Sequence, residues 1–321
     1  MKKLIVAHVF VLGILALNVF GQQFNASCLP NKAVYFADVT GDRKADAIVV
    51  NVDGVIVRRS DGRSFGNNEN WSNGAYYGHR GTFFADVTGD GMTDAIVVND
   101  DGVTVRRSNG SSFTANETWT REGYYATRQM VFADVTGDGM ADAIVVNDDG
   151  VTVRRSNGAG FNPNENWSNG AYYGTSGTFF ADVTGDRMAD AIVINNGVIT
   201  VRRSNGANFS SNETWFSDSS KVSTVYFADV SGDNRADAIS SNGNALISDG
   251  MKFVYDKKFK VKNFTGGKAT DFADVDGDGR MDAMMVGNNK IEAKLSDGKG
   301  LGSNKSFTNN PFYGIDCLRN F

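Results

Sequence analysis

The sequence is poor in histidine, cysteine and proline, and each shortage excludes a class of structure or site. Its 321 residues include two histidines, and because His8 lies in an N-terminal apolar stretch, His79 is the one imidazole outside that stretch. This shortage argues against zinc sites and catalytic triads built on histidine. Three prolines beside 37 glycines indicate short strands joined by tight turns rather than stiff linkers.

The chain also lacks an excess of basic residues. Its 32 lysines and arginines stand against 37 acidic residues, the net charge is −5, and no basic block stands out. Binding to nucleic acid or to an anionic membrane surface relies on positive charge. We therefore expect neither as a partner.

One long apolar run is present, at residues 4–20. It follows two lysines and precedes the small residue Gly21, which is the layout of a secretory signal peptide. We expect residues 1–21 to be removed, which leaves residues 22–321 as a single secreted domain without membrane insertion, periplasmic or at the cell surface if the host is bacterial. The alternative is an uncleaved anchor, for which 17 residues interrupted by polar and glycine positions are marginal.

The string Phe-Ala-Asp-Val, with close variants, recurs six times and sets the organisation of this domain. The spacings between its copies are 48, 48, 48, 47 and 45 residues, which is the signature of a repeat architecture. Units one to four are nearly copies of one another, and units five and six have diverged. The units start near residues 34, 82, 130, 178, 225 and 270.

Apolar residues within each unit follow the pattern of short strands. In the second unit we expect strands over residues 82–87, 95–99, 103–108 and 113–119, joined by turns of the Asp-Asp-Gly and Asn-Gly type. Six four-stranded antiparallel sheets cannot each bury both faces alone. They predict an all-β fold, a closed six-bladed β-propeller with about 48 residues per blade.

The two cysteines lie near opposite ends of the chain. By their positions relative to the repeat, Cys28 and Cys317 both fall in the wedge between units six and one. Because disulfides persist outside the cell, we expect Cys28 and Cys317 to be joined, closing the ring. The chain-entropy model gives about 5 kcal/mol for a loop of this length. Two unpaired thiols are the alternative.

Each unit carries an Asp-rich loop between its first and second strands. Asp occupies positions one, five and nine in all six loops, and position three is Thr, Ser or Asp. Alternating oxygens of this kind wrap Ca²⁺, which takes six to eight oxygen ligands. An EF-hand is excluded, because its twelfth position needs Glu and Val97 or Val145 stands there. We expect up to six Ca²⁺ ions.

The expected calcium ligands are Asp38, Thr40, Asp42, Asp46, Asp86, Thr88, Asp90, Asp94, Asp134, Thr136, Asp138, Asp142, Asp182, Thr184, Asp186, Asp190, Asp229, Ser231, Asp233, Asp237, Asp274, Asp276, Asp278 and Asp282. The alternative is that the loops are solvated turns, in which Asp is common. Carboxylates about 4 Å apart repel by about 4 kcal/mol per pair at an effective dielectric of 20, and a cation relieves this repulsion. Where position six is Arg43, Arg187 or Asn234 instead of Gly, we expect a positive φ, which strains an Arg by about 1 kcal/mol.

Repeated loops of the Asp-Val-Thr-Gly-Asp-Gly-Met-Ala-Asp type give residues from about 30 to 315 a specific resemblance. They resemble the FG-GAP/VCBS repeat family, which includes integrin α-subunit propellers and fungal lectins. The resemblance implies a propeller with calcium loops, and either carbohydrate sites between blades or a protein-binding face. The integrin and fungal propellers have seven blades where this chain has six units, and the Phe-Gly and Gly-Ala-Pro strings that named the family are absent.

A Trp that recurs two residues after a Glu in units one to four is a candidate for stacking on sugar rings. The same slot holds Phe259 and Phe307 in units five and six, so packing between blades is the alternative. Recurring Tyr pairs and Arg pairs could likewise contact a ligand or serve the fold alone. In the second case, an Arg of each pair would form an ion pair with the Glu before Trp. The candidate ligand residues are Trp71, Trp119, Trp167, Trp215, Tyr77, Tyr125, Tyr173, Arg107 and Arg155.

These features lead us to expect a secreted, calcium-stabilised protein that binds glycans or glycoproteins at several equal sites, since linked weak sites gain avidity. The alternative is a protein-binding adhesion or scaffold module that uses a propeller face. We do not expect an enzyme, because no unit carries an acid and base pair that the others lack. A single pocket holding His79 and Arg80 would favour one.

Overall fold

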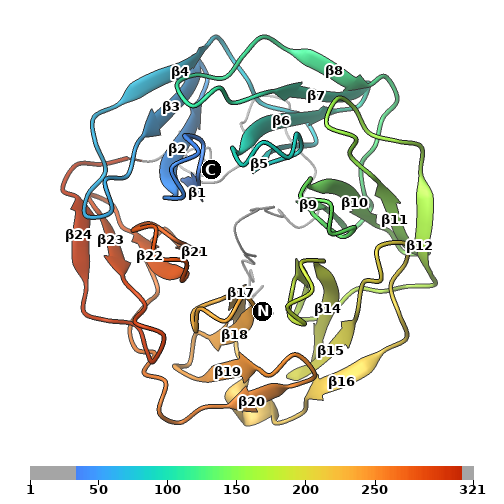
Figure 1. Ribbon diagram of the computed structural model, residues 1–321, viewed down its shortest axis with the longest axis vertical. Helices are drawn as coiled ribbons and strands as arrows, with labels where there is room; N and C mark the ends of the chain where they lie inside the picture. Colours follow the sequence, from blue (N-terminus) through green and yellow to red (C-terminus); the bar gives the residue numbers. More distant parts are fainter. Residues whose placement is uncertain (1–33, 313–321) are drawn as a thin grey trace, which may run out of the picture.

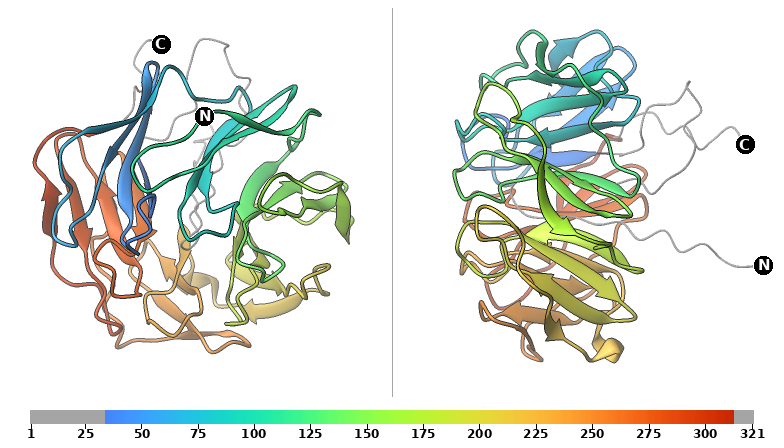
Figure 2. Two further views of the ribbon diagram at one scale, coloured as in Figure 1. Left: turned by 45° about the horizontal axis from the view of Figure 1, so that its top comes forward. Right: turned by 90° about the vertical axis from the view of Figure 1, so that its right-hand side faces the viewer.

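Residues 34–312, which the computed structural model describes, form six four-stranded antiparallel sheets arranged as blades around a central axis (Figure 1). The strands of every sheet pair in chain order, so one continuous segment builds one blade. The first strand of a blade lies nearest the axis and the fourth lies at the rim, and tilted and edge-on views show the disc that results (Figure 2). The expected six-bladed β-propeller is confirmed.

Blades one to three contain β1 (Tyr35–Ala37), β2 (Asp46–Asn51), β3 (Gly54–Arg58), β4 (Glu69–Asn73), β5 (Gly81–Ala85), β6 (Asp94–Asn99), β7 (Gly102–Arg106), β8 (Glu117–Thr120), β9 (Gln129–Ala133), β10 (Asp142–Val146), β11 (Gly150–Arg154) and β12 (Glu165–Asn169). Blades four to six contain β13 (Gly177–Ala181), β14 (Asp190–Asn195), β15 (Val198–Arg202), β16 (Glu213–Phe216), β17 (Val225–Ala228), β18 (Asp237–Ser240), β19 (Ala245–Ser248), β20 (Phe253–Tyr255), β21 (Ala269–Ala273), β22 (Asp282–Val286), β23 (Ile291–Lys294) and β24 (Lys305–Thr308). A short 3₁₀ turn, η1 (Ser219–Lys221), precedes blade five.

Burial along the strands explains their sequence patterns. The second strand of each blade is covered by neighbouring blades on both faces, so β6 reads as the unbroken run Asp-Ala-Ile-Val-Val before its exposed end. At the rim, β8 buries one residue, Trp119, and leaves its neighbours partly or fully exposed. The fourth strand, at the rim, is therefore less apolar than the second strand.

The fourth strand is shorter than the sequence pattern indicates. An expected strand over 113–119 is wrong at its start, because β8 begins at Glu117. Phe113 makes only an isolated bridge with Ser108, and the Asn109 side chain accepts backbone N–H groups from the turn between them. Polar and apolar residues alternate along this tight turn as they do along a strand, which is why the sequence predicts a strand there.

The hydrophobic core is divided among the six junctions between blades. One cluster of buried residues fills each junction, and each cluster draws on both neighbouring blades, as where Trp119 and Phe83 of blade two meet Phe132 and Met130 of blade three. The rim aromatic of one blade packs edge-on against a Phe of the next, with ring centroids 5.0 Å apart for Trp119 and Phe161. Each blade is therefore stabilised by its neighbours.

Two rings of hydrogen bonds close the propeller. The backbone N–H at loop position eight donates to the carbonyl of loop position one in the preceding blade at all six junctions, including Ala45 to Asp274 at 2.7 Å between blades one and six. A serine hydroxyl from each blade also donates to a valine carbonyl of the preceding blade, as in Ser60 to Val275 at 2.7 Å. The described residues alone therefore complete the ring.

Several expectations fall outside the described residues. The proposed signal peptide, Cys28 and Cys317 lie there, so leader removal and the disulfide stay predictions. Within residues 34–312, no helix is long and apolar enough to cross a membrane.

Candidate functional site

Each Asp-rich loop folds around its first carboxylate. In the first loop, Asp38 Oδ1 accepts the backbone N–H of Gly41 at 2.7 Å, and Oδ2 accepts that of Arg43 at 2.6 Å. The Thr40 hydroxyl donates to Asp38 Oδ1 at 3.1 Å. The same acceptor pattern recurs at Asp86, Asp134, Asp182, Asp229 and Asp274. These bonds hold the oxygens of positions one and three close together.

The position-nine carboxylates are completely buried. Asp46 accepts the backbone N–H groups of Ser60 at 2.8 Å and Val39 at 3.2 Å, and its five counterparts have the same partners. The pKa of Asp46 is raised to about 7, chiefly by burial and also by the nearby carboxylates Asp38 and Asp42, which together outweigh the lowering effect of these hydrogen bonds. The pKa of Asp282 is raised to about 8 for the same reasons. An ionised carboxylate here calls for a nearby positive charge.

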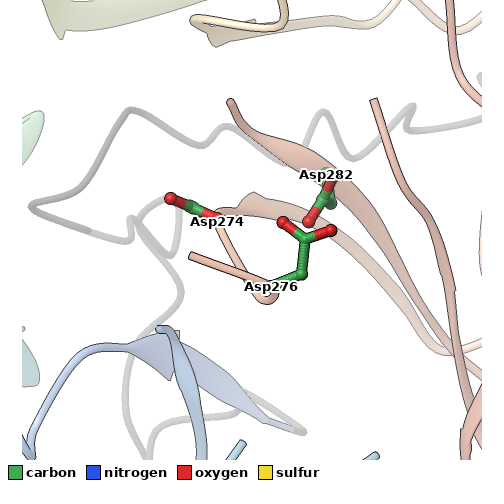
Figure 3. Close-up of side chains that lie close together, drawn as sticks. All are labelled: Asp274, Asp276 and Asp282. Atoms are coloured by element: carbon green, nitrogen blue, oxygen red, sulfur yellow. The ribbon is translucent and has the colours of Figure 1, made fainter. Parts of the chain in front are cut away.

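The sixth loop gathers the most acidic oxygens. One carboxylate oxygen from each of Asp274, Asp276 and Asp282 lies within 4.8 Å of the other two. The Asp276 and Asp282 carboxylates lie close together, with Asp274 to one side (Figure 3). Asp276 Oδ1 is buried and has no hydrogen-bond partner, and burial raises the pKa of Asp276. A close set of carboxylates with one buried, unsatisfied oxygen fits a hard cation such as Ca²⁺. Among the described residues, this is the one loop with three acidic oxygens so close.

Position five behaves differently from the other expected ligands. Its carboxylate accepts the backbone N–H of position seven, as Asp90 does from Met92 at 2.9 Å. In loops one, five and six position seven is basic, and its side chain also pairs with position five, as Lys44 does with Asp42 at 2.7 Å. Arg235 pairs with Asp233 and Arg280 with Asp278 in the same way. In these three loops the position-five charge already has a partner.

The expected backbone conformation at position six is confirmed. Arg43, Arg187 and Asn234 have φ values of 68°, 71° and 64°. Each carries a side chain in the left-handed region, which is strained for any residue with a Cβ. The loop geometry is therefore kept even where glycine is absent.

The candidate arginines Arg107 and Arg155 pair within their own blades. Arg107 Nε donates to Glu117 Oε1 at 2.9 Å, and the guanidinium of Arg155 lies 2.9 Å from Glu165. Each glutamate also accepts the indole N–H of the following Trp, as from Trp119 at 3.3 Å. This is the structural pairing that the sequence left open, and it occurs in blades one to four.

The four candidate tryptophans are packing residues in their own right. Trp71, Trp119, Trp167 and Trp215 are all buried, and each ring meets a Phe of the next blade. Their ligand role stays a prediction. The tyrosine pairs divide: the first member is buried, as in Tyr76, whose hydroxyl donates to the Ala95 carbonyl at 3.0 Å, and the second points outward.

The outward tyrosines lie at the opposite end of the blades from the metal loops. The guanidinium of Arg80 stacks over Tyr125 at 4.1 Å and pairs with Asp100 at 2.5 Å, and Arg128 stacks over Tyr173 at 4.3 Å. Tyr77, the third candidate, is partly buried. His79 is exposed beside Arg80, so these two residues lie on an open surface.

A polar pocket of about 550 Å³ opens between blades three and four. Trp167 and Ser168 on β12 form one side, and Arg202 at the end of β15 forms the other, with Asn166, Asn169, Asn208, Phe209, Ser210 and Ser211 completing the lining. The Arg202 guanidinium stacks over Tyr172 at 4.1 Å, and its Nε donates to Asn212 Oδ1 at 2.6 Å. A second guanidinium nitrogen donates to the Ser168 hydroxyl of blade three. Both blades therefore contribute polar groups to it.

The same arrangement recurs at three other junctions. The first arginine of each pair stacks on an aromatic ring of the connection before it: Arg58 on Phe312, Arg106 on Tyr76 and Arg154 on Tyr124, at 4.1 to 4.3 Å. Each donates from Nε to an asparagine ten residues later, namely Asn68, Asn116 or Asn164. The sequence draws attention to the Arg pairs, but the first arginine of each pair and its asparagine are not among the candidate ligand residues, although their constant spacing in units one to four was the available signal.

Comparisons with known proteins agree with this architecture. A family model described as an FG-GAP-like repeat matches residues 86–145, 134–193 and 182–240. A search of curated proteins finds no match.

Two solved structures share the fold. An Agrocybe aegerita lectin that specifically recognises non-reducing terminal N-acetylglucosamine has a TM-score of 0.62 and 23% identity, and the match covers 92% of this chain and 86% of that one. The Photorhabdus luminescens Tc holotoxin pore has a TM-score of 0.56 and 15% identity; the match covers 84% of this chain but 13% of that one. Residues 86–240 therefore match FG-GAP-like repeats, and the six units of the described chain form a closed six-bladed β-propeller.

Proposed function

We propose that this protein is a secreted, multivalent glycan-binding propeller whose pockets lie between neighbouring blades. The observation that carries the proposal is a four-fold arrangement, an arginine held flat on an aromatic ring and flanked by asparagine, which at Arg202 lines the pocket between blades three and four. Repetition of one arrangement suits a ligand that offers many copies of one small group, as the ends of glycan chains do.

The lining of the pocket supports a sugar as the ligand. Arg202 supplies guanidinium N–H donors, the asparagines supply amide donors and acceptors, and the serines supply hydroxyls. Such groups match the hydroxyl and amide groups of a neutral sugar, while Trp167 and Phe209 give the pocket apolar walls. The A. aegerita lectin with the same fold recognises terminal N-acetylglucosamine, so this sugar is the first to test.

The proposal includes Ca²⁺ in the Asp-rich loops. Positions one, three and nine would hold the ion, and Asp274, Asp276 and Asp282 offer the best donor set. When bound, Ca²⁺ supplies the positive charge that lets the buried position-nine carboxylates stay ionised. Because the loops also carry the hydrogen bonds between blades, the ions would stabilise the junctions that form the pockets.

Calorimetric titration tests glycan binding. We expect N-acetylglucosamine or an oligosaccharide ending in it to bind at about four sites per chain in the presence of Ca²⁺. Arg202→Gln should remove one site, because it takes away the guanidinium between blades three and four. The adjacent Arg203→Gln is the matched control, since Arg203 pairs with Glu213 outside the pocket, and it should keep every site.

The alternatives give different results. Equal loss of binding in Arg202→Gln and Arg203→Gln would indicate that the ligand also contacts the ion-paired arginine, its glutamate and the following Trp. A glycan array provides a wider search. If no oligosaccharide on it binds with Ca²⁺ present, the glycan proposal is excluded and a protein-binding face is favoured.

A further inference from the structure

Blades five and six carry reversed charge at a position that is acidic in the other four blades. The residue two before the rim aromatic is Glu in blades one to four and pairs there with an arginine. In blades five and six it is Lys257 and Lys305, both exposed, and the arginine is replaced by Ile247 and Leu295. The neutralised pairs of the other blades thus give way to Lys257, which forms no ion pair within residues 34–312, and to Lys305, whose charge acts on Asp276 of the same blade.

The segment after Lys257 continues the positive charge. Lys258, Lys260 and Lys262 are exposed, while the intervening Phe259 and Val261 are buried with 5% and 2% of their surfaces accessible. Lys260 and Lys262 therefore point outward from one side of a short stretch, about 7 Å apart if it is extended, and Lys258 lies in the bend just before it. They form a row rather than a point cluster.

Blade six adds to this row. The backbone N–H of Lys260 donates to the Lys299 carbonyl at 3.3 Å, and the N–H of Leu301 donates back to the Lys260 carbonyl at 2.8 Å. This pairing brings the exposed Lys299 beside the row. We call the resulting group the lysine surface; it comprises Lys257, Lys258, Lys260, Lys262 and Lys299.

Nearby carboxylates offset only part of the charge of the lysine surface. Asp256 accepts the backbone N–H of Lys258, and Asp297 accepts that of Lys299, so two negative charges stand beside five positive ones. Within residues 34–312, none of the five lysine side chains forms an ion pair. The net charge of −5 describes the whole chain and does not reveal this cluster. The expectation that no basic block stands out is therefore wrong for this segment.

We propose that the lysine surface binds a linear acidic polysaccharide, one that carries carboxylate or sulfate groups at regular intervals. Ammonium groups in a row are compact point charges, which suit separate anionic groups along a polymer. The outer strands β20 and β24 lie on the convex rim (Figure 1), where a flexible chain can follow the surface and a flat bilayer meets few residues at once.

Nucleic acid is less suited to this surface than an acidic polysaccharide. Single strands are held by exposed aromatic rings that stack on bases, whereas Phe253, Phe259 and Phe264 beside the lysines are all buried. This site lies apart from the pockets of blades one to four, and neutral sugars would not compete for it.

Binding to immobilised heparin and to polygalacturonate tests the proposal with a sulfated and a carboxylated probe. We expect the full chain to bind at least one of them, with affinity that falls steeply as salt rises. Lys257→Glu/Lys258→Thr/Lys260→Thr, which installs the residues of blade two at these positions (Glu117, Thr118 and Thr120), should weaken binding at least ten-fold. Arg63→Glu/Arg121→Glu, an equal change in net charge at exposed residues elsewhere, should weaken it less than two-fold.

Three results would overturn the proposal: binding of neither probe, equal loss in the two variants, or tighter lysine-dependent binding to single-stranded DNA or phosphatidylserine vesicles. Thermal melting of both variants shows that they are folded, and titration with N-acetylglucosamine separates the two proposals. If pocket binding fails while heparin binding depends on the lysines, only the glycan-pocket proposal is lost. Preserved pocket binding in the lysine variant is expected.

Discussion

Neighbouring residues in this protein take on opposite tasks because a strand sends successive side chains to opposite faces. Arg106 turns into the junction and stacks on Tyr76, whereas Arg107 turns to the outside of its own blade and pairs with Glu117. The sequence indicates that one arginine of each pair needs a carboxylate. It does not indicate which one, since that depends on where the strand ends and on the bulge beside it.

At the residue scale, Trp119→Phe separates packing from ligand binding. Phe occupies the same slot in blades five and six, and Trp119 is 6% exposed. We therefore expect the substitution to lower the free energy of unfolding by less than about 1.5 kcal/mol and to leave glycan stoichiometry unchanged. Urea unfolding and calorimetric titration measure the two quantities. Unchanged stability with one site lost would instead assign the indole to the ligand.

At the scale of the element, the loops were more predictable than the rim strands. Asp at fixed spacing defines the loop, and local hydrogen bonds to Asp38 are enough to fold it. The position-five pairing with position seven was not predictable, because either side chain could have turned inward. The start of β8 was missed because the Ser108–Phe113 turn alternates polar and apolar residues as a strand does.

The buried position-nine carboxylates predict an unusual pH dependence. Their pKa in the folded state is raised to about 7, or about 8 for Asp282, above the value near 4 of an unfolded Asp. Folding therefore binds protons between these values, and metal-free protein should lose stability as pH rises from about 4 to about 7. In EDTA, we expect a higher melting temperature at pH 5 than at pH 7.5.

Calcium should reverse this trend, because it binds the ionised carboxylates of the folded state. With several millimolar Ca²⁺ at pH 7.5, the melting temperature should rise well above that in EDTA, and Asp276→Asn/Asp282→Asn should reduce the gain. Melting curves that coincide in EDTA and Ca²⁺ at pH 7.5 would remove the calcium assignment and leave the loops as solvated turns.

At the scale of the whole molecule, repetition made the fold predictable while the pockets stayed hidden. Six units of similar length specify a closed ring, and the last junction uses the same contacts as the others, such as Ala45 with Asp274. The pockets form only where two blades meet, so their residues lie far apart in the chain or in separate turns. Constant spacing marks them, but only the fold shows that Arg202 meets Ser168.

Closure also bears on the predicted Cys28–Cys317 disulfide. Peptide mapping without reductant should recover one fragment that contains both cysteines, with an N-terminus at Gln22 in the secreted protein. Because the described residues already complete the ring, reduction should lower the melting temperature without unfolding the protein at room temperature. Two free thiols in the secreted protein would contradict the disulfide, and unfolding on reduction would show that the hydrogen-bonded junctions are insufficient.

One uninterrupted segment per blade, with no strand exchanged between first and last, makes the structural unit also the unit of inheritance. A gene duplication or deletion in register adds or removes a whole blade, and its product keeps every remaining sheet intact. Near-identical units one to four are the expected trace of such copying. Each copy brings one stacked arginine with its asparagine, and it contributes one side of each of the two junctions beside it. Valency can therefore change in whole steps by recombination, while a diverged copy, such as blade five with its lysines, is free to acquire a different ligand.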